Sequence, residues 1–532
     1  MTKMTGGQAL VRSLYKEGIR VLFGLPGVQL YHAMDALYDE SGIRFITTRH
    51  EQATAYMADG YSRGGGGIGA ALVVPGPGLL NASAAIGTAY AASSPILIVS
   101  GQIQRKLIGV RRGVLHEVDD QLDSIRPVTK WAHRVLRPEE IPDAIHEAFH
   151  QLRTGRPRPV EIEIPPETLA EEAEVELREP GNYMRPGADG ERIVEGARIL
   201  AEAKKPLIWA GGGVISSGAS LALLKLAEHL QAPVVSTNEG KGAISDRHYL
   251  SLGSAIPRNR KADVISQHDV VLAVGTRLAN SDVLKQQKVV QIDIDEEELG
   301  RNYKNTFGIV GDARRSLEEF YEVLSATTSP HRSREKELEV LKAYTVKESR
   351  SVEPQESLTS AIRAAVPDNG IVVAGMTQIG YYSRTNYPVY EPGTYLTSSY
   401  FGNLGFAFPV ALGAKVSQPE RAVVAISGDG GFLYNSQELA TAVRYGINAV
   451  VVVFNDNAYG NVLRDQINRF DGRSIGAELH NPDFVKLAEA YGAKGLRVHG
   501  PEQLKEGLQE ALSTEAPTLI EVPVEMMPSP YV

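Results

Sequence analysis

The chain contains no cysteine among its 532 residues. This absence excludes disulfide bonds, thiolate metal sites, iron–sulfur clusters and a cysteine nucleophile. It is compatible with the cytoplasm, which is the location we expect. The chain also lacks an excess of positive charge, because 55 Lys and Arg residues against 64 Asp and Glu residues give a net charge of −9. A mildly acidic surface argues against nucleic acid or an anionic membrane as a general partner.

Hydrophobic targeting segments are missing as well. The N-terminus has the pattern of an amphipathic helix, without the apolar core of a signal peptide. No charged residue lies between Arg63 and Arg105, but this stretch contains Pro75, Pro77, Pro95 and many glycines. Because such residues disfavour a membrane-spanning helix, we expect a strand, a helix and a further strand buried inside an α/β domain.

The sequence does contain a regular alternation of short apolar runs and helical patterns. Near-continuous apolar strands that alternate with helices predict parallel, doubly wound sheets covered on both faces. The predicted strands are 21–26, 43–48, 68–75, 95–101, 159–165, 206–213, 233–237, 270–276, 289–295, 370–375, 421–428, 448–455 and 517–524. The predicted helices of the first third are 5–18, 28–39, 51–63 and 79–92.

Two polar segments divide the chain into three predicted α/β domains. An acidic segment with Pro and Gly covers 167–190, and a charged segment covers 331–355. We therefore expect domains at 1–168, 190–330 and 355–532. In open parallel sheets, ligands bind beyond the carboxyl ends of the strands, so the informative residues should directly follow the strands.

An acidic pair stands at two such positions in the last domain. Gly428-Asp429-Gly430-Gly431 follows one predicted strand, and Asn455-Asp456-Asn457-Ala458 follows the next. If these strands are neighbours, Asp429 and Asp456 converge and offer the hard oxygens that Mg²⁺ prefers. The glycines and the following helix start would admit an anion close to the backbone.

These segments resemble the metal and diphosphate motif of the thiamine-diphosphate (ThDP) enzymes. The resemblance implies that Asp429, Asp456 and the carbonyl of Ala458 hold Mg²⁺. The family more often has Asn at position 456, so the extra carboxylate could change the metal preference. The implied cofactor-binding residues are Gly428, Gly430, Gly431, Asn455, Thr377 and Gln378.

Two further segments match the same family. Arg49-His50-Glu51-Gln52-Ala53 resembles the segment with the activating glutamate, which implies that Glu51 shares a proton with N1′ of the aminopyrimidine. That chemistry requires a dry pocket that raises the pKa of the carboxyl group, whereas a helix start favours the ionised form. The 402–409 segment resembles the loop beneath the cofactor, which implies that Leu404 separates its rings and that the Gly402 carbonyl accepts from its 4′-amino group.

Within the family, the chain is most similar to the acetolactate synthase and benzoylformate decarboxylase group. The pocket positions depart from both branches, because His116 stands where the first has Gln and Val74 stands where the second has His. We predict a substrate pocket formed by Val28, Gln29, Val74 and Pro75, with an apolar wall. His116 is a candidate acid or base, although an ordinary loop histidine is the alternative.

The central domain leaves its cofactor undecided. Gly211-Gly212-Gly213 follows a strand, but Ser216 breaks the dinucleotide-binding fingerprint. Relatives hold FAD, ADP or neither at this place. Arg277, after another strand, is either a phosphate contact or a solvated side chain.

The function that the resemblance implies is a ThDP- and Mg²⁺-dependent lyase or carboligase for small 2-oxo acids or acyloins, similar to acetolactate synthase. A 2-oxo acid decarboxylase, a lyase similar to benzaldehyde lyase and a non-catalytic nucleotide-binding homologue are the alternatives. Family geometry places each cofactor between two subunits, which implies at least a homodimer and commonly a homotetramer. The expected partner is a small-molecule substrate.

Overall fold

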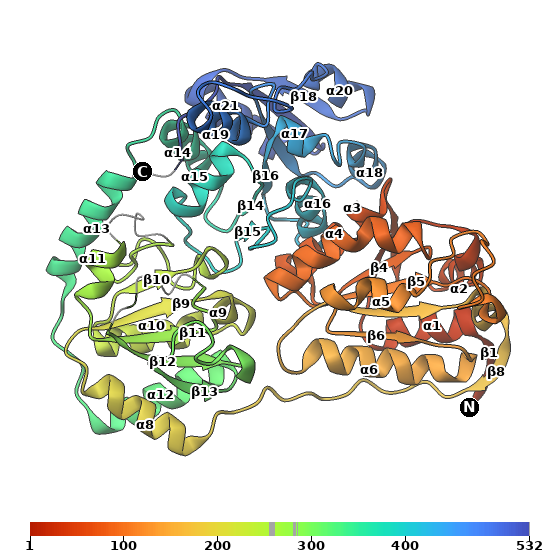
Figure 1. Ribbon diagram of the computed structural model, residues 1–532, viewed down its shortest axis with the longest axis horizontal. Helices are drawn as coiled ribbons and strands as arrows, with labels where there is room; N and C mark the ends of the chain where they lie inside the picture. The colour runs from red at the N-terminus through yellow and green to blue at the C-terminus, as the bar shows by residue number, and fades with distance from the viewer. Residues whose placement is uncertain (255–260, 280–283, 285, 531–532) are drawn as a thin grey trace.

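Three regions of the chain each fold around a parallel β-sheet of their own (Figure 1). A computed structural model describes residues 1–254, 261–279, 284 and 286–530. Buried hydrophobic clusters lie on both faces of the sheets. The alternation of strands and helices therefore predicted the fold class correctly, as three doubly wound α/β domains.

The N-terminal sheet has six strands in the order β3-β2-β4-β5-β7-β6. They are β2 (Val21–Gly24), β3 (Arg44–Thr47), β4 (Gly69–Val73), β5 (Ile96–Gly101), β6 (Trp131–Arg134) and β7 (Val160–Ile164). The helices around this sheet include α1 (Gly6–Lys16), α2 (Tyr31–Asp39), α3 (Glu51–Tyr61), α4 (Pro77–Ala92), α5 (Gln121–Ile125) and α6 (Ile141–Arg153). All five predicted strands form, and β6 adds a sixth. The helix predicted over 28–39 begins with a 3-10 turn at Val28–Leu30.

The uncharged stretch after Arg63 forms β4, α4 and β5, which is the strand, helix and strand expected of it. All three elements lie inside the N-terminal domain (Figure 1). In the part of the chain that the structure describes, no helix is long and apolar enough to cross a membrane.

Both polar segments that divide the predicted domains contain regular structure, so the first, 167–190, is not the plain linker that its composition indicates. The first begins with α7 (Pro166–Ala170) and β8 (Glu172–Val175), and β8 pairs antiparallel with β1 (Thr2–Thr5). The period-two burial of β8, with Val175 inward and the glutamates exposed, is typical of a half-buried strand. The second contains α13 (Glu335–Ser349), which runs from the central to the C-terminal domain in Figure 1.

The central sheet has five parallel strands in the order β10-β9-β11-β12-β13. They are β9 (Pro206–Ala210), β10 (Val234–Ser236), β11 (Val270–Val274), β12 (Lys288–Asp293) and β13 (Thr306–Val310), of which the last was not predicted. The helices of this domain include α8 (Gly190–Ala201), α9 (Gly212–Ser216), α10 (Ser220–Leu230), α11 (Lys261–Ser266) and α12 (Ala313–Thr327).

The C-terminal sheet has six parallel strands in the order β15-β14-β16-β17-β19-β18. They are β14 (Ile371–Ala374), β15 (Tyr395–Thr397), β16 (Val423–Gly428), β17 (Val450–Asn455), β18 (Lys494–Arg497) and β19 (Thr518–Pro523). The helices are α14 (Gln355–Ala365), α15 (Gln378–Asn386), α16 (Ala407–Ser417), α17 (Asp429–Phe432), α18 (Glu438–Tyr445), α19 (Gly460–Arg469), α20 (Phe484–Ala490) and α21 (Gly500–Ser513). The edge strands β15 and β18 were not predicted.

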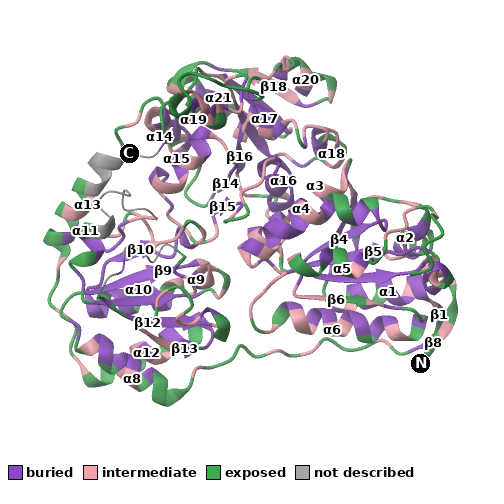
Figure 2. Cartoon of the chain, viewed as in Figure 1, coloured by how far each residue is buried: buried purple, intermediate pink, exposed green. Residues whose placement is uncertain are grey.

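Helices α3 and α16 join the N-terminal and C-terminal domains through a close backbone contact. A Cβ at Gly60 would lie 2.0 Å from the carbonyl oxygen of Val410, and a Cβ at Gly413 would lie 2.0 Å from that of Met57. Any larger residue at Gly60 or Gly413 would push the helices apart. One buried cluster runs through both domains around this contact (Figure 2), so the helix that begins at Glu51 is anchored to the other domain.

Candidate active site

Two carboxylates follow neighbouring strands of the C-terminal sheet. β16 and β17 pair in parallel, so Asp429 and Asp456 stand at the same carboxyl edge. Asp429 is 2 % exposed, and burial raises its pKa. Burial, and then the charge of Asp429, raises the pKa of Asp456 to about 6. Two interacting carboxylates with raised pKa values favour a bound cation, which would remove their repulsion.

Asn481 orients Asp429, one carboxylate of this pair, and sequence reasoning did not find it. Its Nδ2 donates to Asp429 Oδ2 at 2.6 Å and to Asn455 Oδ1 at 2.9 Å. Asn455 in turn donates to Glu521 Oε1 at 2.8 Å. The side chain of Asn455, predicted to bind the cofactor, therefore lies in a network that orients Asp429. The segment with Asn481 has no motif of its own that could have identified it.

The backbone around Asp456 is shaped by Ala458 and Gly460. Ala458 is buried and forms an antiparallel bridge with Glu478. A Cβ at Gly460 would lie 1.9 Å from Asp456 Oδ2, so only glycine leaves room for this carboxylate. The structure thus places the three predicted metal ligands, Asp429, Asp456 and Ala458, at one edge of the sheet.

The glycine turn after β16 lies against Leu404. Gly430 donates its N–H to Asp429 Oδ1 at 2.8 Å. A Cβ at Gly431 would be 3.7 Å from Leu404 Cδ2, which places Leu404 beside the turn. Gly402 adopts a φ of +65°, a conformation that favours glycine. The 402–404 loop and the 428–431 turn are therefore brought together.

Thr377 and Gln378 stand at the start of α15, beside the same turn. A Cβ at Gly428 would be 3.1 Å from Thr377 Oγ1. Gln378 Oε1 accepts from Arg464 Nη1 at 2.7 Å. Within the described part of the chain, the buried Nε2 of Gln378 has no hydrogen-bond partner. A buried donor without a partner is costly, which is consistent with a ligand that completes it.

Glu51 is the first residue of α3, in the N-terminal domain. His50 caps this helix, because its Nδ1 accepts from the N–H of Gln52 at 3.1 Å. Asn81 Nδ2 donates to Glu51 Oε2 at 3.1 Å. The other carboxylate oxygen lies 3.7 Å from where a Cβ at Gly78 would be. Glu51 is half-buried among neutral groups, and its role as a proton donor and acceptor stays a prediction.

Among the predicted pocket residues, Val74 lies near Glu51. A Cβ at Gly78 would lie 2.6 Å from Val74 Cγ2, which places Val74 close to the glutamate. His116 Nδ1 and Gln29 Oε1 are 3.2 Å apart. Val74 and Gln29 are each 7 % exposed. The structure thus places Val74 near Glu51 and places His116 beside Gln29.

The remaining two pocket residues differ in exposure. Pro75 is buried, and a Cβ at Gly101 would lie 2.8 Å from its Cδ and 3.2 Å from the Cβ of Gln29. Val28 is 48 % exposed, so it lies at the open side of this group of residues.

Comparison with known families assigns all three domains. The N-terminal TPP-binding domain of thiamine pyrophosphate enzymes matches residues 4–124, the central domain matches 193–320, and the C-terminal TPP-binding domain matches 374–522. The chain belongs to the thiamine pyrophosphate enzyme family. Thiamine pyrophosphate is the same compound as ThDP, and this ThDP enzyme catalyses C–C bond lyase or transferase chemistry.

The relatives that match nearly the whole chain are named either as acetolactate synthases or as a decarboxylase. The chain is 36 % identical to a probable acetolactate synthase large subunit of Methanocaldococcus jannaschii, over 99 % of this chain and 93 % of that protein. It is 34 % identical to the acetolactate synthase large subunit of Haemophilus influenzae, over 96 % and 93 %. It is also 34 % identical to a probable 2-ketoarginine decarboxylase of Pseudomonas aeruginosa, over 98 % and 94 %. Family membership is settled by these comparisons, whereas the substrate is not.

The residues at the carboxyl edge of the C-terminal sheet fit ThDP and a divalent cation. Asp429 is buried and Asp456 half-buried, and the pKa of each carboxyl group is raised. The turn at Gly430 and Gly431 leaves the backbone open to an anion. The buried amide of Gln378 supplies a donor that still lacks a partner in the described structure.

A buried polar network supports the pocket side of this ThDP enzyme. Gln121 Oε1 accepts from the N–H of Gly76 at 2.8 Å, and its Nε2 donates to Glu163 Oε2 at 2.8 Å and Ser100 Oγ at 3.0 Å. Burial and the nearby Glu163 hold the pKa of Glu161 well above its usual range. A Cβ at Gly76 would lie 2.4 Å from the carbonyl oxygen of His116. The network therefore fixes the turn against which His116 packs.

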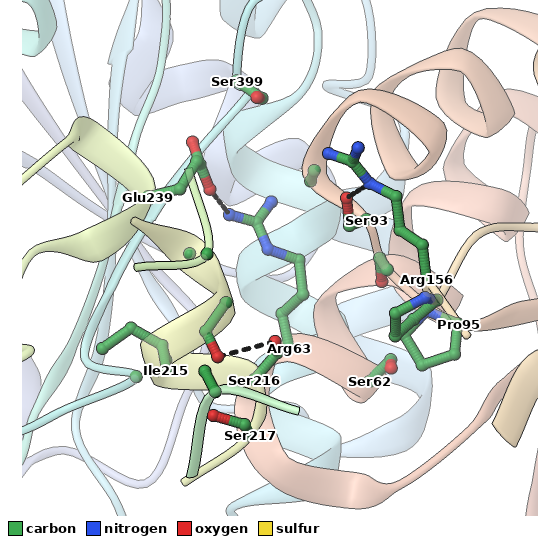
Figure 3. Close-up of a pocket in the computed structure, with 18 of the residues that line it drawn as sticks. Ser62, Arg63, Ser93, Pro95, Arg156, Ile215, Ser216, Ser217, Glu239 and Ser399 are labelled. Carbon is green, nitrogen blue, oxygen red and sulfur yellow. Dashed lines mark hydrogen bonds and ion pairs between the residues drawn. The ribbon is translucent and has the colours of Figure 1, made fainter. Parts of the chain in front are cut away.

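A cavity of about 1590 Å³ lies where the three domains meet (Figure 3). Arg63 reaches from the N-terminal domain to Glu239 of the central domain, with Nη2 and Oε2 2.9 Å apart. Arg156 and Arg277 also line the cavity, as does Lys241, whose pKa burial lowers to about 8. Arg277, predicted either to meet a phosphate or to be solvated, is thus a half-buried residue of the cavity wall.

Proposed function

We propose that this enzyme is a ThDP- and Mg²⁺-dependent lyase or carboligase that joins small 2-oxo acids or aldehydes, in the manner of acetolactate synthase. The observation that carries the proposal is the position of Val74 near Glu51, together with the contact between Gln29 and His116. Such a pocket suits a short aliphatic substrate with one carbonyl group. Acyloins, which contain the same bond that carboligation forms, are substrates for the reverse reaction.

In this proposal Mg²⁺ is held by Asp429, Asp456 and the carbonyl of Ala458. Bound ThDP supplies a nucleophilic carbon and an electron sink for the charge that develops on the substrate. Glu51 exchanges a proton with N1′ of the cofactor, and Leu404 and the Gly402 carbonyl orient it. The proposed diphosphate contacts are Thr377, Gln378, Gly428, Gly430, Gly431 and Asn455.

The side chains around the substrate have separate tasks. Val28, Val74 and Pro75 exclude water from the substrate. A dry wall favours loss of the carboxylate, because its charge is dispersed in the transition state, and it protects the reactive carbon until a second carbonyl arrives. His116 exchanges a proton with the substrate oxygen, and Gln29 gives a neutral hydrogen bond. His116 adopts a φ of +68°, so its side chain position is set by an uncommon backbone conformation.

Decarboxylation without ligation is the second candidate, and the resemblance to a probable 2-ketoarginine decarboxylase favours it. A substrate with a guanidinium group would require an acidic partner. The four predicted pocket residues, Val28, Gln29, Val74 and Pro75, include no carboxylate, and neither does the candidate acid or base His116. We therefore favour an uncharged aliphatic side chain on the substrate.

The proposal includes a homodimer, and a homotetramer of two such dimers, in the cytoplasm. Large apolar side chains are exposed next to both halves of the site, with Leu80 at 45 %, Phe401 at 42 % and Tyr434 at 49 % exposure. Leu80 adjoins Asn81, and Phe401 and Tyr434 adjoin the two cofactor loops. A second subunit would bury such side chains, and the family geometry would place its C-terminal domain against the N-terminal domain of the first subunit. Sedimentation at several protein concentrations would measure the mass.

The cavity between the three domains is the place where we expect FAD or ADP, if the chain binds either. Its arginines would meet phosphate groups, and Asp293 in the same wall would meet hydroxyl groups. The two nucleotides are distinguished by the absorbance of the purified enzyme, since only FAD absorbs visible light.

Product analysis tests the proposal. The full-length enzyme is incubated with ThDP and Mg²⁺ and with pyruvate, glyoxylate, short aldehydes, acyloins and 2-ketoarginine. We expect a ligated product from pyruvate or glyoxylate and slow turnover of 2-ketoarginine. Release of aldehyde alone, with 2-ketoarginine as the best substrate, would establish the decarboxylase instead.

A further inference from the structure

Strand β3 is an edge strand of the N-terminal sheet, yet its outer side is not open. The sheet order places β3 beside β2 alone. The N–H groups of Arg44 and Thr48 donate to carbonyl groups of Arg20 and Gly24, on the β2 side. Successive N–H groups of a strand point to opposite sides, so those of Thr47 and Arg49 point outward. Unpaired outward groups on an edge require a partner.

Helix α18 of the C-terminal domain supplies these partners. Tyr445, its last residue, accepts from the N–H of Thr47 on its hydroxyl oxygen at 2.9 Å. Glu438, its first residue, accepts from the N–H of Arg49 with Oε1 at 3.0 Å and Oε2 at 3.2 Å. The carbonyl oxygen of Tyr445 also accepts from Arg44 Nη2 at 3.1 Å. The helix thus lies along the edge strand and replaces a neighbouring strand.

The contact between α18 and the edge strand reaches Arg49, two residues before Glu51. Asn435, just before α18, continues it, because its Nδ2 donates to Gln52 Oε1 at 3.1 Å and to the carbonyl of Gly405 at 2.8 Å. The C-terminal domain therefore contacts the chain on both sides of Glu51, at Arg49 and at Gln52. Gly405 belongs to the loop that carries Leu404.

We propose that Glu438 is a positioning residue, which fixes the start of the Glu51 helix through the N–H of Arg49 and so sets where the Glu51 carboxylate meets the cofactor. The part of this proposal that concerns catalysis rests on the proposed function of Glu51. We name Glu438 and Tyr445, with the N–H groups of Arg49 and Thr47, the α18 latch.

The surroundings of Glu438 support a fixed acceptor. Glu438 is fully buried, and Thr441 Oγ1 donates to its Oε2 at 2.6 Å. A buried carboxyl group is retained only where hydrogen bonds satisfy it, and here they come from Thr441 and from the backbone that leads into Glu51. Burial also raises the pKa of Glu438 to about 7, while the N–H groups of Arg49 and His50 act in the opposite direction.

The test compares two matched pairs of variants in the full-length protein. Glu438→Met removes the acceptor at similar size, and Tyr445→Phe removes only the hydroxyl group. Glu356→Met and Tyr382→Phe are the controls, because Tyr382 donates to Glu356 Oε2 at 2.7 Å inside the same domain and away from β3. Glu438→Gln keeps an acceptor oxygen and covers the case in which Glu438→Met fails to fold.

Hydrogen–deuterium exchange of the cofactor-free protein gives the structural readout. In peptides that cover residues 43–52, we expect exchange to accelerate by about tenfold in Glu438→Met, less in Tyr445→Phe and Glu438→Gln, and not at all in the controls. Unchanged exchange in these peptides, in both Glu438→Met and Glu438→Gln, would overturn the latch.

Proton exchange at C2 of bound ThDP gives the catalytic readout. We expect Glu438→Met to slow it by about tenfold at saturating cofactor, with partial rescue in Glu438→Gln and little change in ThDP affinity. A wild-type protein that does not accelerate C2 exchange would contradict the proposed role of Glu51 and the catalytic part together. If Glu438→Met accelerates amide exchange in residues 43–52 but leaves proton exchange at C2 of ThDP unchanged, only the proposed effect of Glu438 on catalysis is overturned.

Discussion

The two halves of the candidate site are built differently. At the metal end, Asp429 and Asp456 lie in one domain, and Asp429 is buried and oriented by Asn481. At the activating end, Glu51 is half-buried, its neighbour Asn81 is neutral, and its helix start is held by another domain. The carboxylates proposed to bind the cation are thus positioned within one domain. The proposed proton exchange at Glu51 would depend on how two domains pack. Substitutions should separate the two functions.

Asp429→Ala should have the largest effect, at the metal end. Without this carboxylate the cation that joins the diphosphate to the protein loses a ligand, and we expect ThDP affinity to fall by at least about 100-fold. Calorimetric titration of ThDP in the presence of Mg²⁺ measures it. Retention of wild-type affinity would show that the metal lies elsewhere.

Glu51→Gln should affect the other half alone. The amide is nearly isosteric with the carboxyl group but cannot exchange a proton with N1′, so we expect kcat to fall by about 100- to 10,000-fold. ThDP affinity should stay within about threefold of wild type, because the metal end is intact. Steady-state kinetics and the same titration separate these two outcomes, and an equal loss of both would refute the division of the site.

Glu438→Gln should change how stability depends on pH. Because the folded state raises the pKa of Glu438 from 4.5 to about 7, its contribution to the free energy of unfolding is complete below pH 4.5 and is lost as the pH rises through 7. Relative to wild type, the variant should therefore gain about 3 kcal/mol between about pH 5 and about pH 8. The difference in Tm between the two proteins, followed across this range, checks the sign. A constant difference would mean that Glu438 titrates normally.

His116→Ala should shift the products more than the rate. If His116 exchanges a proton with the substrate oxygen, its loss should alter the ratio of ligation to simple release by about threefold to tenfold. Chromatography of the products from pyruvate gives the ratio, with His499→Ala, in an exposed position of the C-terminal domain, as the control. An unchanged ratio of ligation to release in His116→Ala would support the alternative that His116 is an ordinary loop histidine.

Asp456→Asn should have the smallest effect at the metal end. Asn offers one oxygen and is the usual residue of the family, so ThDP affinity should change by less than about tenfold. If Asp456→Asn lost ThDP binding as completely as Asp429→Ala, Asp456 would not be a metal ligand that Asn can replace.

Within the described part of the chain, the sequence predicted every inner strand of the three parallel sheets but missed four of their six edge strands. Inner strands of a parallel sheet are buried on both faces and read as apolar runs, such as β16 and β17. Of the missed edge strands, β6, β13 and β18 contain polar or half-exposed residues, whereas β15 is buried but only three residues long. Nothing in their local composition distinguishes them from loops.

The candidate site divides in the same way. Asp429, Asp456 and Glu51 were found because they stand in motifs at strand ends. Gln121 and Asn481 were missed because their partners are far along the chain, and only the fold brings them together. Motifs thus predict which groups perform the chemistry, and the tertiary structure shows which groups hold those candidates in place.

The most direct test of the divided site is the rate of hydrogen–deuterium exchange at C2 of bound ThDP in wild-type enzyme and Glu51→Gln, with cofactor occupancy measured in the same samples. The account predicts that both proteins bind ThDP and Mg²⁺ and that the wild-type enzyme accelerates exchange by orders of magnitude. Glu51→Gln should exchange at nearly the rate of free ThDP. Equal acceleration by both proteins at full occupancy would contradict it.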